Sequence, residues 1–170
     1  VAAVRRLVAA LGMCAVALGA SAEERTLETG DGRVIRYSVI EPATPPGPAS
    51  AAATALALVR LLSAGRVEDA ATLSNAPARR LEVLQDYRAF VGEDEFRRIF
   101  GRFLEPRNRI AAEVAIGPRR LVIWDLGEAG HHLAAQYFVE ADGRFVLDDV
   151  PSEARTDLRR VLQAYRKDKA

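Results

Sequence analysis

The spacing of apolar residues changes once along the chain, from a helical period in the first half to alternation in the second. Between positions 51 and 104, apolar side chains recur every three or four residues, as they do at Phe96, Ile99 and Phe103. This period of about 3.6 residues is typical of amphipathic helices. It predicts helices at positions 51–63, 67–73, 78–90 and 94–104.

From Arg109 onward, apolar and polar residues alternate, which is the period of a strand with one buried face. Asp142-Gly143 is a strong hairpin signal, and the other separators are also short, so the strands are expected to form an antiparallel meander. Ser152 is a plausible N-cap for a last helix at 152–165, and the tail at 166–169 is expected to fray. The predicted strands cover positions 110–116, 121–126, 133–140 and 144–150.

Two strand-like runs within residues 25–41 flank Gly30-Asp31-Gly32, a turn sequence that predicts a β-hairpin. Four prolines in residues 42–50 exclude a helix there and predict an extended linker. The hairpin is therefore expected to be either an appendage or an edge addition to the main sheet.

Residues 1–22 have the order of a secretory signal peptide. Two arginines precede an apolar run at positions 7–18, and the small residues Ala20 and Ala22 stand just before a pair of acids. The run is shorter than the roughly 20 residues that a spanning helix needs. Cleavage after Ala22 is therefore predicted, no membrane span remains after it, and the mature protein is expected in a bacterial periplasm or outside the cell.

Charge and cysteine content narrow the classes of partner. The formal charge of +1 drops just below zero without the arginines of the signal, and such a balance argues against nucleic acid as a partner. The single cysteine lies inside the predicted signal, so no disulfide is expected in the mature chain. The predicted organisation is a signal at 1–22, a hairpin with a Pro-rich linker at 23–49, and one α+β domain at 50–170.

The segment at 61–73, LLSAGRVEDAATL, resembles the opening helices of NTF2-like (cystatin-like) domains. The closing segment from Ala135 through Phe145 to Val150 resembles the paired long strands of that superfamily. The resemblance implies N-terminal helices packed on a curved four-stranded antiparallel meander, the NTF2-like cone, with the C-terminal helix as an addition. It also implies a pocket inside the cone; some members are hydrolases, dehydratases or isomerases, and others only bind or dimerise.

Acid–base residues are the candidates for catalysis in such a cone, because members that are enzymes commonly place an acid beside a Tyr or His there. The candidates in this sequence are Asp86, Tyr87, Asp125, His132 and Tyr137. Under the alternative interpretation, Asp125 starts a turn and Trp124 fills the core. No catalytic motif decides between the two.

The remaining polar clusters have ordinary explanations as well as functional ones. His131 and His132 are adjacent, so on a strand they would point to opposite faces, and neither a metal nor another cofactor is predicted. The middle of the chain is rich in arginine, beginning with Arg79-Arg80. Those arginines form either a solvated surface of mixed charge or a cluster that binds a carboxylate or phosphate ligand.

Three functions follow as hypotheses. The first is an exported, non-catalytic protein that binds a small molecule or an envelope protein, as a homodimer through the open face of its sheet. The second is a small enzyme that uses acid–base residues in the cone. The third is an envelope-assembly or stress protein whose hairpin at 25–41 pairs with an edge strand of another chain.

Overall fold

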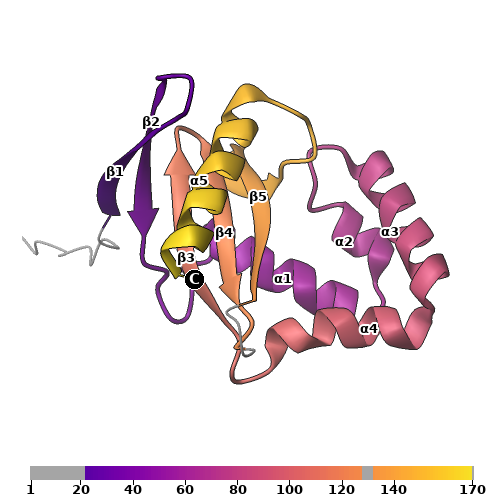
Figure 1. Cartoon of the computed structure of the whole chain (residues 1–170). Coiled ribbons are helices and arrows are strands. Elements are labelled where there is room, and N and C mark those ends of the chain that lie inside the picture. Colours follow the sequence, from indigo (N-terminus) through magenta and orange to yellow (C-terminus); the bar gives the residue numbers. More distant parts are fainter. Residues whose placement is uncertain (1–21, 128–131, 170) are drawn as a thin grey trace, which may run out of the picture.

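The chain folds into a six-stranded antiparallel sheet with helices on both faces (Figure 1). The computed structural model describes residues 22–127 and 132–169. The strands are β1 (Ala22–Glu28), β2 (Val34–Ile40), β3 (Arg109–Ile116), β4 (Arg119–Asp125), β5 (Leu133–Ala141) and β6 (Arg144–Leu147). The helices are α1 (Ala51–Ser63), α2 (Val67–Ala71), α3 (Pro77–Val91), α4 (Glu93–Gly101), a 3-10 turn η1 (Arg102–Leu104) and α5 (Glu153–Lys169).

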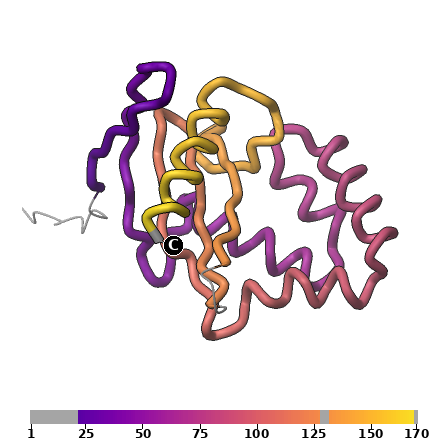
Figure 2. The backbone as a smooth tube through the Cα atoms, in the orientation of Figure 1, coloured from indigo at the N-terminus to yellow at the C-terminus, as the bar shows by residue number. Residues whose placement is uncertain are grey.

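The prediction of a four-stranded meander forming an NTF2-like cone is wrong, because the N-terminal hairpin extends the same sheet. The six strands lie side by side in the order in which they occur in the sequence, and β2 pairs with β3 through Ser38–Ala115 and Ile40–Glu113. The docking of β2 buries Ile35, which joins the core under α5. The Pro-rich linker then leads away from β2, and Figure 2 follows the excursion at 41–108 that returns at β3.

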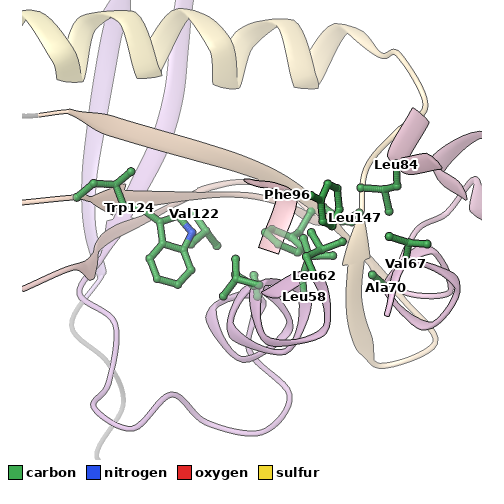
Figure 3. Close-up of a cluster of buried hydrophobic side chains, with 14 residues drawn as sticks. Leu58, Leu62, Val67, Ala70, Leu84, Phe96, Val122, Trp124 and Leu147 are labelled. Atoms are coloured by element: carbon green, nitrogen blue, oxygen red, sulfur yellow. The ribbon is translucent and has the colours of Figure 1, made fainter. Parts of the chain in front are cut away.

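Two apolar cores lie on opposite faces of the sheet, because side chains alternate along each strand. On β4, Val122 and Trp124 face the helices α1 to α4, whereas Leu121 and Ile123 face α5. Figure 3 shows Val122 and Trp124 pointing toward α1, where Leu58 and Leu62 lie. Helix α5 packs over the second face through Leu158, Val161 and Leu162, and the homodimer expected through an open sheet face stays a prediction.

Helix α1 has the predicted bounds because its ends carry clear signals. The hydroxyl of Ser50 accepts a hydrogen bond from the N–H of Ala53 at 3.1 Å, and Gly65 adopts the left-handed conformation with φ of 75°. The expectation of a frayed C-terminus is wrong. Helix α5 continues to Lys169, and the Arg166 guanidinium donates to the carbonyl of Leu133 at 2.9 Å.

The two edges of the sheet differ in whether another segment of the chain pairs with them. Beside β6, the backbone N–H of Leu147 donates to the carbonyl of Leu73, and the N–H of Asn75 donates to the carbonyl of Leu147. The segment at 73–75 therefore covers that edge, whereas the outer edge of β1 pairs with no other described strand. Among the helices of the described residues, none combines the length and the hydropathy needed to cross a membrane.

Candidate functional site

Two consecutive aspartates, Asp148 and Asp149, mark the turn between β6 and α5. Asp148 is only 2% exposed, and its carboxylate accepts hydrogen bonds from Nε of Arg119 and from the side-chain amide of Asn75, both at 3.0 Å. Its backbone N–H donates to the carbonyl of Tyr137 at 2.9 Å. A buried carboxylate with this many partners holds the turn in place.

Asp149 faces the start of α3 instead. Its Oδ2 accepts a hydrogen bond from Nε of Arg80 at 2.8 Å, and a second guanidinium nitrogen donates to Oδ1, so the pair is bidentate. The hydroxyl of Ser74 also donates to Oδ2, at 2.5 Å. Burial by itself raises the pKa of Asp149, but the hydrogen bonds from Arg80 and Ser74 outweigh it and lower that pKa below its ordinary value.

A cavity of about 280 Å³ opens next to the Arg80–Asp149 pair. Four arginines contribute to its wall, while Asp149 is the only acid there and already neutralises Arg80. Among the described residues, Arg79 and Arg159 form no ion pair, so the cavity carries excess positive charge. The full lining is Arg79, Arg80, Val83, Asp149, Pro151, Ser152, Arg155, Thr156 and Arg159. This arginine cavity, as we call it, has the charge that an anion requires.

Arg155 is the most unusual of these side chains. Its guanidinium lies over the ring of Tyr137, 5.2 Å from the centroid, which fixes its position. Its Nε is buried and has no hydrogen-bond partner among the described residues. Arg155 also lies in the first turn of α5, whose N-cap is Ser152. A buried donor without an acceptor, at the positive end of a helix of this length, is suited to an anionic ligand.

A second cavity of about 300 Å³ shares three wall residues, Arg80, Asp149 and Arg155, with the arginine cavity. Its remaining wall is mostly apolar and comes from α1, α3, α4, the middle of β5 and the end of β6. Those apolar residues include Leu58, Leu62, Leu84, Phe100 and Leu147. The two cavities together therefore offer a cationic part and an apolar part on either side of the same ion pair.

The five acid–base candidates do not come together. Asp86 is exposed on α3, and Tyr87 on the same helix packs its ring against Phe96 and Phe100. Asp125 lies at the end of β4, where its carboxylate accepts from the N–H of Gly127 at 3.0 Å. Asp125 thus starts a turn, and Trp124 is buried in the core, as the alternative interpretation had it.

The other two candidates lie on β5 or just before it. His132 is exposed, and its backbone carbonyl accepts from the N–H of Leu126. Tyr137 pairs in register with Leu121, four residues along β4 from Asp125, a separation of about 13 Å. Of the five, Tyr137 alone belongs to the cavities described above, where it supports Arg155.

The histidine pair and the signal peptide fall wholly or partly outside the described residues. His131 and residues 1–21, which include Ala20, belong to the undescribed parts of the chain. In the described remainder, no three His, Cys, Asp or Glu side chains group closely enough to hold a metal ion. The expectation that the protein has no metal stays a prediction.

One buried acid has no signal in the sequence that sets it apart from the exposed acids. Glu113 on β3 is 6% exposed, its Oε1 lies 3.4 Å from Nε of Arg120, and its carboxylate lies near the backbone N–H of Ala52 in the first turn of α1. Burial raises the pKa of Glu113, and Arg120 and the Ala52 N–H offset that rise in part. Glu113 lines neither of the two cavities, and its contacts anchor α1 to the sheet.

Comparison of the chain with protein-family models, with curated proteins and with solved structures finds no significant match. The resemblance to NTF2-like domains therefore stays a prediction from the sequence. The functional assignment depends on the geometry of the site itself.

Proposed function

We propose that this protein is an exported, non-catalytic binding protein that holds a small anionic molecule in the arginine cavity. The observation that carries this proposal is a cavity where four arginines meet one carboxylate, with Arg155 in its wall, whose Nε is buried and has no partner among the described residues. A carboxylate or phosphate group would accept hydrogen bonds from Arg155 and Arg159, and the dipole of α5 would favour its charge.

The ligand class follows from the neighbouring apolar cavity. A molecule with its anionic group at Arg155 would place an attached apolar part against the side chains of Leu84 and Leu147. Both cavities lie at or just below the lower end of the usual size range for ligand sites, which favours a small amphipathic acid over a large cofactor.

A binding role is favoured over catalysis because the residues at the cavity are committed to structure. Asp149 is held as the ion-pair partner of Arg80, and Asp148 as that of Arg119. General acid–base chemistry needs a group placed within hydrogen-bond reach of a reacting atom and free to exchange a proton. Of the five acid–base candidates, only Tyr137 lies at the site, and its ring serves Arg155.

Export is proposed from the signal-like order of residues 1–22. Cleavage after Ala22 would leave Glu23 as the first residue, and Glu23 to Glu28 would keep their pairing with β2. Mass spectrometry of the protein from its native host tests this, because a mature chain starting at Glu23 is expected. An intact N-terminus would contradict export with cleavage and would leave the binding proposal unaffected.

Titration with inorganic phosphate and with octanoate, followed by two-dimensional NMR, tests the site. Shifts are expected for the backbone amides of Arg155 and Arg159 with both probes, and for Leu84 and Leu147 with octanoate alone. The variant Arg155→Gln is expected to weaken binding about tenfold or more, since hydrogen bonds between charged groups contribute about 1.5–3 kcal/mol.

The matched control is Arg98→Gln, which removes an exposed arginine that pairs with Glu95 on α4. That variant is expected to bind both probes as the unmodified protein does. Equal loss of binding in Arg98→Gln and Arg155→Gln would indicate attraction by overall charge only and would refute the site. Absence of shifts around α5 with either probe would also refute it.

A second candidate function, protein–protein contact through strand pairing, is favoured by the outer edge of β1. All of β1 except Leu27 is exposed, and no described strand pairs with its outer edge. Strand addition at such an edge is a common mode of recognition. Replacing Thr26 with proline in β1 would block pairing there, and an unchanged set of envelope partners in this variant would exclude the idea.

A further inference from the structure

Helix α3 carries a stripe of three large apolar residues along its outer side, and one of them, Tyr87, also packs its ring against Phe96 and Phe100. Phe90 is 87% exposed, Val83 is 52% exposed and Tyr87 is 37% exposed. These positions are separated by four and three residues, so they follow one line along the helix. Figure 1 shows α3 at the periphery of the molecule, away from the sheet.

The exposed apolar residues Val83 and Phe90 do not lie on the side of α3 that is buried in the core. Leu84 is its only fully buried residue, and Leu84 joins the core with α1 and α2. Val83 and Phe90 add exposed apolar surface, at helical spacing, to a helix that already packs inward through Leu84 and the ring of Tyr87. Contiguous apolar surface of this kind marks an interaction site.

The charges at the two ends of α3 identify the partner. Arg79 lies in its first turn, while Asp94 lies just beyond its C-terminal end, in the first turn of α4. Neither side chain forms an ion pair with any residue that the structure describes. The two ends of the stripe therefore carry a free positive charge at Arg79 and a free negative charge at Asp94, and the exposed acids Glu82 and Asp86 add negative charge along the flank of α3.

We propose that the stripe of Val83, Tyr87 and Phe90 is the interface of a homodimer in which α3 packs antiparallel against α3 of a second copy. A two-fold axis near Tyr87 would set Val83 of each copy on Phe90 of the other. The same axis would bring Arg79 of each copy toward Asp94 of the other. A surface that complements itself under a two-fold rotation is what a symmetric dimer requires.

The argument for the dimer does not depend on ligand binding at the anion site, although the two sites share residues. Val83 and Arg79 also belong to the wall of the arginine cavity, so the dimer would place Phe90 of the second copy beside its rim. Arg155 and Arg159 lie on α5 and outside the stripe. Variants of those two arginines therefore test ligand binding, and variants of Phe90 test assembly.

Sedimentation velocity of the purified protein over a range of concentrations tests the dimer. The unmodified protein is expected to form a dimer, and Phe90→Asp is expected to raise the dimer dissociation constant at least about tenfold, because each interface contains the residue twice. The matched control is Val34→Asp, a substitution at a residue of similar exposure to Val83 but on β2. It is expected to leave the dimer unchanged.

A charge exchange distinguishes this arrangement from loose apolar association. Arg79→Glu and Asp94→Arg are each expected to weaken the dimer, and the double variant is expected to restore it. A protein that stays monomeric at all concentrations overturns the proposal. A dimer that survives Phe90→Asp, or one that the double variant fails to restore, overturns it as well.

Discussion

The guanidinium of Arg80 and the carboxylate of Asp149 form a two-point ion pair that joins the start of α3 to the turn before α5. The pair separates the cationic cavity from the apolar one. Because its two members are 69 positions apart in the sequence, the pair links segments that no local pattern connects. Its electrostatics lead to the first prediction.

Asp149→Asn is expected to destabilise the protein at neutral pH by about 1–3 kcal/mol, because the charge-assisted bonds from Arg80 and Ser74 are lost. The pKa of Asp149 is lowered from its ordinary 3.8 on folding. Its contribution is therefore present above that value and is lost as the pH falls through the lower, folded pKa. Urea unfolding at several pH values should show the two proteins converging below about pH 4. Asp86→Asn, at an exposed aspartate of α3, is the control and should have little effect at pH 7.

Glu113→Gln should show the opposite pH dependence. Burial raises the pKa of Glu113 above its ordinary 4.5, so the folded protein binds that proton more tightly than the unfolded chain does. The stability of the unmodified protein should therefore fall relative to Glu113→Gln as the pH rises from 4.5 through the folded pKa, and then level off. A difference between the two that is constant with pH would contradict the burial of this charge.

Tyr137→Leu is expected to weaken phosphate binding several-fold, because Arg155 would lose the aromatic ring that positions its guanidinium. Tyr137→Phe keeps the ring and should bind phosphate normally. The resonance of the Arg155 Nε–H should move in the leucine variant even without ligand, since the ring current is removed. Equal affinities in both variants would show that the ring does not position Arg155.

Phe96→Ala is expected to reduce the free energy of unfolding by about 3–5 kcal/mol. Phe96 is 0% exposed, and its ring contacts those of Tyr87 and Phe100, so the cavity left behind would be lined by rigid groups. Leu104→Ala, at a residue that is 40% exposed in η1, should cost about 1 kcal/mol or less. Chemical denaturation of both variants at one protein concentration measures the contrast. Similar losses in the two would contradict the position of Phe96 in the core.

The sequence pattern predicted most of the helices and strands because their signals are local. Ser50 and Gly65 mark the ends of α1, and alternation from Arg109 onward marks the strands. Whether the hairpin is an appendage or an edge addition to the sheet stayed open, because the choice depends on where Ile35 is buried. Under α5, Ile35 joins a core with Leu158, and no local period reports that contact.

The candidate site was only partly visible in the sequence. Arg79 and Arg80 were recognised as members of an arginine-rich region, with anion binding as one of two explanations. The aspartates Asp148 and Asp149 were not singled out, since an acidic pair before a helix is common on protein surfaces. Their role arises where segments 74–80, 148–149 and 155–159 converge.

The excursion at 41–108 has a consequence for the order of folding. Strands β3 to β6 follow one another closely in the sequence, so their pairing closes small loops, whereas pairing of β2 with β3 must first close the long excursion. The meander is therefore expected to form early and the hairpin to dock onto it late. In native-state hydrogen exchange, the amides of β1 should exchange at a lower opening free energy than those of β4, and that difference would report the last step of folding.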